Sequence, residues 1–261
     1  MPRTEFWTDR TVGWYARALA RSDFAAKVVA AIGPALAGCR DALDVGAGCG
    51  ALALPLAQRL ERVTALEPSP AMARGLRQAA AAAGLGNVTV VEAAWGEVDV
   101  APHDLVVCAH VGELLKAGSA FLAATPALTR RLLVLVRDAP RAEDQDKFFY
   151  RELYPALLGR VYEHRSHASE TLAGLRAVGI EPRVTTIEYS SDQPFEDLDE
   201  ACDFWMTYMG LEGQPPRDYL KGFLSERLVK TDGKWRAPFR KTAVLFIWSP
   251  GHPVRRPGRP G

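Results

Sequence analysis

The feature that most constrains the fold is a glycine-rich stretch directly after an apolar run. Residues 41–45 read DALDV, glycines follow at 46, 48 and 50, and the helix-like sequence ALALPLAQRL begins at 51. Glycines allow left-handed backbone conformations and close approach to a ligand. A helix that begins after such a loop presents unpaired N–H groups to that ligand. The stretch therefore predicts a strand, a loop and a helix that together bind a cofactor.

More apolar runs of strand length follow along the chain. They occupy 62–68, 87–93, 103–111, 131–138, 181–190 and 241–249. Most are nearly continuous in apolar character, which is typical of parallel strands buried on both faces. Helix-like segments lie between them, and the one at 69–86 has Ser69 as a cap, Pro70 at its first position and Gly84 to end it. This alternation predicts a doubly wound, Rossmann-like α/β sheet.

The chain divides into four segments by pattern. Residues 1–40 have helical spacing of apolar residues and are expected to form an N-terminal helical lid. Two more amphipathic helices are predicted within 192–234, as a second part of the lid. We expect the Rossmann-like domain to comprise 41–191 plus 235–249, with 192–234 as a helical insertion. The Pro/Gly/Arg-rich residues 250–261 are predicted to be a flexible tail.

Composition argues against several partners. The chain has 32 Lys and Arg against 31 Asp and Glu, so no net basicity favours nucleic acid. The first ten residues, MPRTEFWTDR, lack the apolar core of a signal peptide, and the longest apolar runs are too short to cross a bilayer. Four scattered cysteines without a CxxC pair indicate reduced thiols. We expect a cytoplasmic protein without a membrane partner and, since no clustered acids are evident, without a metal.

Two cofactor classes fit the glycine loop. Gly46, Gly48 and Ala51 satisfy the dinucleotide-binding pattern G-x-G-x-x-G/A. Proteins that bind S-adenosylmethionine also have a glycine loop between a strand and a helix. Glu67 follows the second strand, where both classes place a carboxylate for the ribose hydroxyls, so Glu67 does not separate them. Asp44 at the strand end, the helical residues before the loop and the lack of a separate substrate domain favour S-adenosylmethionine.

On these residues the sequence resembles the class I S-adenosylmethionine-dependent methyltransferases, in their small-molecule branch of the methyltransferase-11/25 type. LDVGAGCG matches the first motif of that family, D/E-x-G-x-G-x-G, and VTALEPSPAM matches its second strand, acid and helix. VTVVEAAWGEV and HDLVVCAHVGELL resemble its third and fourth strands. The resemblance implies a mostly parallel seven-stranded sheet with an antiparallel last strand, plus a helical lid, and S-adenosyl-L-methionine as the cofactor.

The resemblance also implies which residues contact the cofactor. Asp44 would favour its ammonium group, the loop with Gly46, Gly48 and Gly50 would pass under its methionine part, and Glu67 would accept both ribose hydroxyls.

The adenine side departs from the family pattern. An acid often follows the third strand in that family, but Ala94 stands there in this chain, with Glu92 as the one possible substitute. The ring of Trp95 could still pack on the adenine.

The loop after the fourth strand is expected to face the methyl acceptor, because ligands bind at the carboxyl ends of such strands. His110 is the candidate general base, or else a packed or cofactor-contacting residue, and Glu113 lies nearby. The family implies a lid made by residues 10–20 and 195–230. Trp14, Tyr15 and Tyr150 are then the candidates for the substrate pocket.

The predicted function is methyl transfer from S-adenosylmethionine to a small molecule, independent of metal. Two motifs are missing after the fourth strand. The lack of Asn/Asp-Pro-Pro-Tyr/Phe argues against methylation of the amino groups of bases or glutamine, and the lack of Pro-Cys argues against methylation of cytosine C5. Three alternatives stay open, namely a nicotinamide-dependent oxidoreductase, a non-catalytic S-adenosylmethionine-binding partner protein and a protein or RNA methyltransferase. The sequence indicates neither the acceptor nor the oligomeric state.

Overall fold

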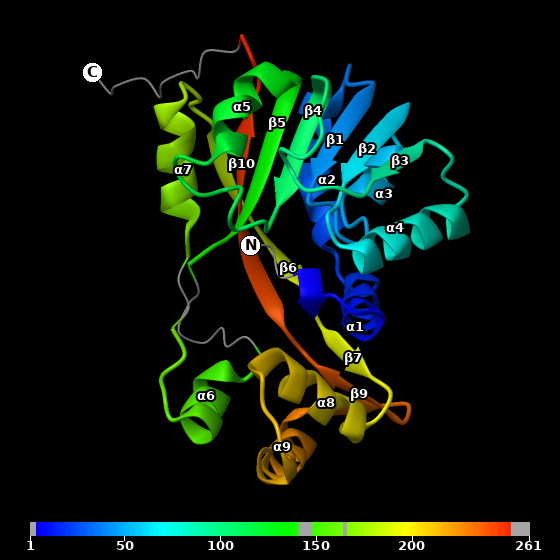
Figure 1. Ribbon diagram of the computed structural model, residues 1–261, viewed down its shortest axis with the longest axis vertical. Helices are drawn as coiled ribbons and strands as arrows, with labels where there is room; N and C mark the ends of the chain where they lie inside the picture. Colours follow the sequence, from blue (N-terminus) through cyan, green and yellow to red (C-terminus); the bar gives the residue numbers. More distant parts are fainter. Residues whose placement is uncertain (1–3, 141–147, 164–165, 252–261) are drawn as a thin grey trace.

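The protein consists of a large sheet domain and a smaller second unit below it (Figure 1). The structure, a computed structural model, describes residues 4–140, 148–163 and 166–251. The predicted flexible tail at 250–261 therefore lies outside the described residues, apart from its first two. Among the described helices, none is both long and apolar enough to cross a membrane.

The central sheet has seven strands in the order β3-β2-β1-β4-β5-β10-β6. Strands β1 to β5 run parallel, whereas β10 is antiparallel to both of its neighbours. The strands are β1 (Asp41–Val45), β2 (Arg62–Leu66), β3 (Val88–Val91), β4 (His103–Ala109), β5 (Thr129–Asp138), β6 (Arg183–Ser190) and β10 (Arg240–Trp248). The predicted Rossmann-like doubly wound sheet with an antiparallel last strand is confirmed.

Helices cover both faces of this sheet (Figure 1). One face carries α2 (Phe24–Leu36), α3 (Ala53–Ala57) and α4 (Pro70–Ala82), and the other carries α5 (Ala120–Leu128) and α7 (Ala168–Ala177). Helix α4 begins as predicted, because the Ser69 hydroxyl accepts a hydrogen bond from the Met72 N–H and Pro70 occupies the first turn. Each face has its own apolar core, so the strands are buried on both sides.

The second unit mixes helices with a small sheet. It contains α6 (Tyr150–Leu158), α8 (Leu198–Met209), α9 (Gln214–Arg227) and a three-stranded sheet of β7 (Gln193–Phe195), β9 (Lys234–Ala237) and β8 (Val229–Thr231). The segment 192–234 was predicted to be helical, but it also holds the short strands β7 and β8 and the first residue of β9. Strands of three or four residues give too little alternation to be recognised in sequence. Residues 235–237 of β9 and α6, assigned to the large domain from sequence, pack here instead.

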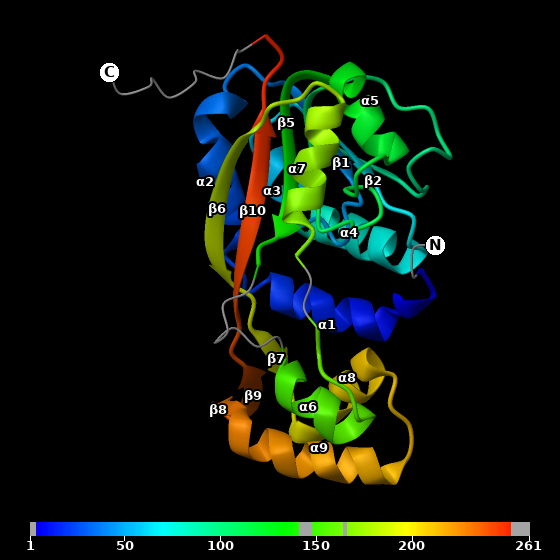
Figure 2. The same ribbon diagram turned by 90° about the vertical axis from the view of Figure 1, so that its left-hand side faces the viewer.

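Residues 1–40 also divide between the two parts. Helix α2 packs Phe24, Val28 and Ile32 into the core of the large sheet, so it is no part of a lid. The preceding elements η1 (Thr4–Phe6) and α1 (Asp9–Leu19) lie between the large sheet domain and the second unit (Figure 2). The expected N-terminal lid is thereby restricted to η1 and α1.

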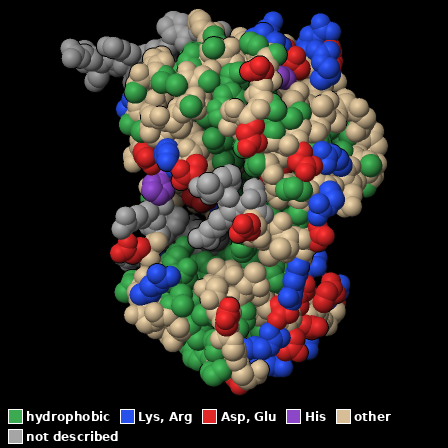
Figure 3. Space-filling model, viewed as in Figure 1, with side chains coloured by type: hydrophobic (Ala, Val, Ile, Leu, Met, Phe, Trp, Pro, Cys, Tyr) green, Lys and Arg blue, Asp and Glu red, His purple; other side chains and the backbone are tan. Residues whose placement is uncertain are grey.

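Helix α1 is fastened on both sides. The Trp14 indole N–H donates to Glu200 of α8 at 3.0 Å, and Arg17 pairs with the same carboxylate. On the other side, Arg74 of α4 pairs with Asp9. Charged side chains of both signs gather over α8 and α1, whereas hydrophobic side chains gather on the same face farther up (Figure 3). Helix α1 therefore joins the two parts of the molecule physically.

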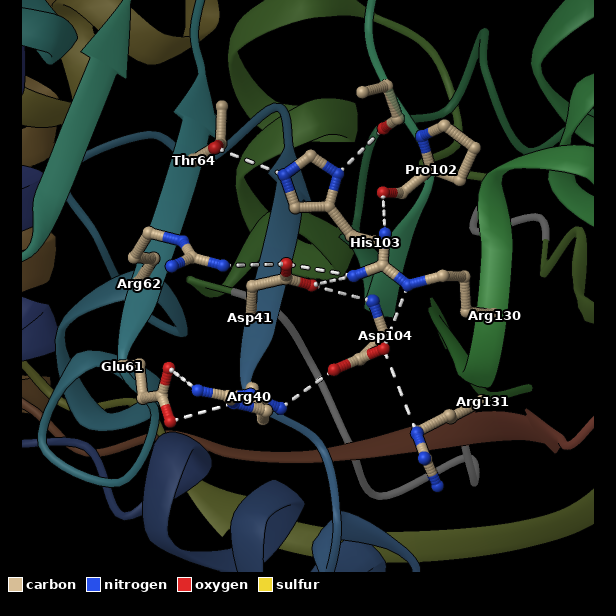
Figure 4. Close-up of polar contacts among 11 residues, drawn as sticks. Arg40, Asp41, Glu61, Arg62, Thr64, Pro102, His103, Asp104, Arg130 and Arg131 are labelled. Carbon is tan, nitrogen blue, oxygen red and sulfur yellow. Dashed lines mark hydrogen bonds and ion pairs between the residues drawn. The ribbon is translucent and has the colours of Figure 1, made fainter.

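The amino-terminal edge of the large sheet holds a charged network (Figure 4). Asp41 at the start of β1 accepts from the Asp104 backbone N–H at 2.7 Å and from Arg130 at 2.8 Å. Asp104 in turn accepts from the Arg40 N–H and from Arg130 Nε, each at 2.9 Å. These contacts tie the starts of three neighbouring strands, β1, β4 and β5, at the edge opposite to the glycine loop.

The network predicts an acid-sensitive contribution to stability. Burial alone would raise the pKa of Asp104, but the Arg40 N–H and Arg130 outweigh it, so the pKa lies below its ordinary value. A lowered folded-state pKa stabilises the protein above the unfolded-state pKa, and that stability is lost as pH falls through the folded value. Asp104→Asn should lower the free energy of unfolding at pH 7 by about 1–3 kcal/mol and flatten its acid dependence below about pH 5.

Urea titrations at pH 7 and pH 4 check this expectation. Glu181→Gln is the matched control, because Glu181 pairs only with Arg176 and both side chains are more than half exposed. It should leave unfolding unchanged. Equal effects of the two substitutions would show that the network contributes nothing beyond an ordinary surface pair.

Candidate functional site

A cavity of about 600 Å³ opens at the carboxyl ends of the parallel strands. It is bounded by the loops that follow β1, β2, β3 and β4, by Trp7 and by Tyr15 of α1. The neighbouring strands β1 and β4 are where the strand order reverses, the position at which doubly wound sheets bind ligands. The predicted site residues that line it are Tyr15, Gly46, Gly48, Glu67, Ala94, Trp95, His110 and Glu113.

The glycines of the first loop are required by two different restraints. Gly46, Gly48 and Gly50 all have positive φ, at 75°, 57° and 89°, a region that side chains disfavour. A Cβ on Gly46 would also lie 2.3 Å from Val111 Cγ2, and one on Gly50 would lie 2.4 Å from Leu76 Cδ1. Gly46 therefore lets the β1 and β4 loops meet, while Gly50 lets the chain pack on α4 and does not line the cavity.

Glu67 is held rigidly at the cavity wall. Its Oε1 accepts from the Ser69 N–H and its Oε2 from the Gly48 N–H, both at 2.8 Å. Burial raises the pKa of this carboxyl, although the two N–H groups counteract the effect. Each carboxylate oxygen has more than one acceptor position, so Glu67 keeps capacity for two further donors from a ligand.

Asp44 lies behind the loop rather than in the cavity wall. Asp44 is only 2% exposed. Burial raises the pKa of its carboxyl to about 7, although a hydrogen bond from the Ala53 N–H lowers it in part. Its Oδ2 has no hydrogen-bond partner. A buried carboxylate oxygen without a donor is costly, so this position is suited to a cationic or N–H-bearing ligand group.

The residues after β3 form the far wall. The Trp95 ring lines the cavity and contacts Phe121 edge-on at 5.1 Å between ring centres. The Ala94 N–H donates to Glu97 Oε2 at 2.7 Å, so it is already engaged. Glu92, the possible substitute for the missing acid, pairs with Arg77 at 3.0 Å and is not among the lining residues.

His110 follows β4 and faces the cavity in an unusual backbone conformation. Its φ is 60°, which is uncommon for a residue other than glycine. Its backbone N–H donates to Val136 O at 3.0 Å, and its ring lies 5.4 Å from that of Phe24. Glu113 lies at the exposed rim, where it pairs with Lys116 at 2.6 Å. His110 is thus the better placed of the two for proton transfer.

Two residues predicted for the substrate pocket lie elsewhere. Trp14 is 1% exposed and packs on Phe204, and Tyr150 is buried beside Tyr154 and Tyr162. Both belong to the apolar core of the second unit rather than to the cavity wall. Tyr15, one residue from Trp14, faces the opposite way and covers Gly48, with its Cε1 3.9 Å from where a Cβ would lie.

Sequence reasoning missed several lining residues. Trp7, Met72 and Val111 contribute apolar surface to the cavity. Trp7 contacts the Tyr15 ring at 5.7 Å, so a pair of aromatic rings from the N-terminal segment closes one side. Trp7 lies eight residues before Tyr15, about two helical turns, and this spacing is the sequence feature that could have indicated the aromatic pair. No group of three or more potential metal ligands occurs in the part of the chain that the structure describes.

Comparisons with known proteins agree on the fold. The model of the family described as methyltransferase domain matches residues 42–130. A candidate methyltransferase from Bacillus halodurans C-125 has 18% identity and a TM-score of 0.52, and the match covers 85% of this chain and 98% of the other. The match to a Synechocystis magnesium protoporphyrin IX methyltransferase with bound SAH covers 86% and 81% of the two chains, with 18% identity and a TM-score of 0.48. No curated protein matches the chain.

The contact between the two loops predicts a specific effect of adding one methyl group. Gly46→Ala and Gly48→Ala both place a side chain at positive φ, which costs about 1–2 kcal/mol. Only Gly46→Ala also collides with Val111, an overlap that adds about 1–3 kcal/mol. Thermal unfolding should therefore show the larger loss for Gly46→Ala.

The double variant Gly46→Ala with Val111→Ala provides the control. Removing the Val111 methyl groups should recover part of the loss caused by Gly46→Ala, and should recover none of that caused by Gly48→Ala. Equal losses for the two glycine variants, with no recovery, would contradict the proposed loop contact.

Proposed function

From the match of residues 42–130 to a methyltransferase domain, we propose that the protein is a class I, S-adenosylmethionine-dependent methyltransferase that methylates a small-molecule acceptor. The observation that supports this most directly is one cavity with a rigid carboxylate on one side and a bare glycine backbone on the other. Glu67 supplies the first wall, and Gly46 and Gly48 supply the second. When bound, S-adenosylmethionine would supply an activated methyl group on a sulfonium.

The residues present fit this cofactor. Glu67 would accept the two ribose hydroxyls on the lone pairs that Ser69 and Gly48 leave open. Asp44, with its orphaned Oδ2, would stabilise the ammonium group directly or through a water. Trp95 would pack on the adenine, and the glycine loop would allow the methionine part to approach the backbone.

The acceptor would enter beside the β4 loop. Methyl transfer from a sulfonium is an in-line displacement, so the protein's main tasks are to orient the acceptor and to exclude water. Trp7, Val111 and Leu114 supply apolar walls for that purpose, and His110 is the group placed to take a proton. The lining is apolar with few polar groups, which is typical of small-molecule sites.

We further assign a lid role to α1 together with the second unit. Trp7 and Tyr15 already cover part of the cavity, and ion pairs join Arg10 and Arg17 of α1 to Asp203 and Glu200 of α8. Because α1 and α8 are tied together, cofactor binding under Tyr15 should order both.

Calorimetric titration with S-adenosylhomocysteine tests the cofactor proposal. The wild-type protein should bind it, and Glu67→Gln should weaken binding about 10- to 100-fold, since a hydrogen bond to a charged group contributes about 1.5–3 kcal/mol. Glu92→Gln is the matched control and should bind like the wild type, because Glu92 is paired outside the cavity.

Two results of this titration would contradict the proposal. Binding of NAD(H) in place of S-adenosylhomocysteine would indicate an oxidoreductase. If neither ligand releases heat on titration, and the protein is shown to be folded by its cooperative unfolding, then it does not bind this cofactor. Binding without turnover of any acceptor would instead support a non-catalytic S-adenosylmethionine-binding partner protein.

Limited proteolysis tests the lid. Cleavage within 10–20 and within 195–230 should slow together when S-adenosylhomocysteine is added, because Arg10, Arg17 and Trp14 couple the two segments. Cleavage in α7, on the far face of the sheet, serves as the internal control and should not change. Protection of only one of the two segments would contradict a coupled lid.

A further inference from the structure

His110 is contacted at both of its ring nitrogens. Nδ1 lies 3.4 Å from Asp138 Oδ1, at the end of β5, and Nε2 lies 3.5 Å from the Tyr189 hydroxyl of β6. Neither Asp138 nor Tyr189 was recognised in sequence, because each comes from a different strand and neither lines the cavity. The three residues meet only because β10 brings β6 to within one strand of β5.

The main chain fixes the ring in this position. The left-handed conformation of residue 110 turns the chain sharply at the end of β4, and the backbone N–H is held by Val136 O at 3.0 Å. Phe24 packs against the imidazole and also against Tyr189, at 4.9 Å between ring centres. A strained conformation that the surroundings hold in place is a recurrent property of functional sites.

We propose that Asp138 is a positioning residue that orients His110 as the general base, and that the acceptor is therefore a hydroxyl or N–H compound that loses a proton on methylation. This inference rests on the proposed methyl transfer. A carboxylate oxygen 3.4 Å from Nδ1 favours the proton on that nitrogen, and thereby the tautomer in which Nε2 carries the lone pair.

The contact at Nε2 is long enough to be exchanged for one with the acceptor. A distance of 3.5 Å is at the long limit of a hydrogen bond, so an acceptor O–H or N–H entering the cavity can take the place of the Tyr189 hydroxyl. The reaction then balances: the sulfonium S–CH3 bond breaks and leaves its electron pair on sulfur, the new bond forms from the acceptor atom to the methyl carbon, and the acceptor proton moves to Nε2.

Few described charges surround the imidazole. Asp138 of β5 and Tyr189 of β6 face it, Phe24 of α2 is apolar, and Glu113 on the following loop is paired with Lys116. Arg137, beside Asp138 on β5, points to the opposite face of the sheet, where its Nη1 lies 3.4 Å from Gly112 O. Asp138 thus places a carboxylate oxygen 3.4 Å from the ring.

Nitrogen NMR of the full-length protein labelled at histidine tests the positioning role without any acceptor. The His110 signals are assigned with His110→Gln. In the wild type, neutral His110 should hold its proton on Nδ1. Asp138→Asn should lower the pH midpoint of its titration by about one unit, because a neighbouring carboxylate favours the charged imidazole.

A second histidine pair in the same chain is the matched control. His167 Nδ1 lies 3.1 Å from Glu170 Oε2, so Glu170→Gln removes a histidine-bound carboxylate elsewhere and should leave the His110 midpoint and tautomer unchanged. Tyr189→Phe keeps the ring packing and should move His110 less than Asp138→Asn does. An unchanged His110 midpoint and tautomer in Asp138→Asn would overturn the positioning role, as would a larger shift in Tyr189→Phe.

Product analysis with deuteriomethyl S-adenosylmethionine and a pool of small-molecule extracts tests the acceptor class. The labelled product should carry its methyl on an oxygen or nitrogen that had a hydrogen before the reaction. Its formation should fall at least 100-fold in His110→Gln and about 10-fold or more in Asp138→Asn. A labelled sulfonium or quaternary nitrogen would overturn this inference while sustaining the proposed function, whereas failure to bind S-adenosylhomocysteine would refute the proposed function itself.

Discussion

The geometry of the site depends on one carboxylate that joins two loops. Glu67 at the end of β2 accepts from the Gly48 N–H of the β1 loop and from the Ser69 N–H that begins α4. These bonds bring three features to one place: the bare glycine backbone, the helix start and a buried negative charge. Since Glu67 already spends half of its acceptor capacity inside the protein, it can bind ligand hydroxyls without losing its own orientation.

The carboxylates at the two edges of the sheet differ in how well the protein stabilises their charge. At the amino edge, Asp41 and Asp104 are saturated by backbone N–H groups and Arg130, which lowers their pKa values. At the carboxyl edge, Asp44 is buried with an oxygen unpartnered, and its pKa is raised to about 7. Asp41 and Asp44, at the two ends of β1, thus have opposite environments, and the destabilising one lies behind the glycine loop of the cavity.

The sequence was sufficient for those features that are encoded locally. The strand–loop–helix at 41–57, the Ser69 cap and the position of Glu67 follow from neighbouring residues. The comparisons agree with the predicted fold, and the methyltransferase-domain model matches residues 42–130. Contacts between segments that are distant in the sequence could not be predicted from neighbouring residues. Trp14 and Tyr15 are adjacent on α1, and only the position of α8 decides which of them is buried. Likewise, Asp138 reaches His110 through strand order alone.

Helix α1 makes the smaller unit relevant to chemistry in the larger one. Its Tyr15 lies over the glycine loop, its Trp14 is inserted in the second unit and its Asp9 reaches α4. A displacement of α8 therefore cannot leave the cavity wall unchanged, because the bond from Trp14 to Glu200 would have to break or α1 would have to follow. The second unit contributes no cavity-lining residue in the described chain, yet its contacts with α1 help to fix Tyr15, which lines the cavity.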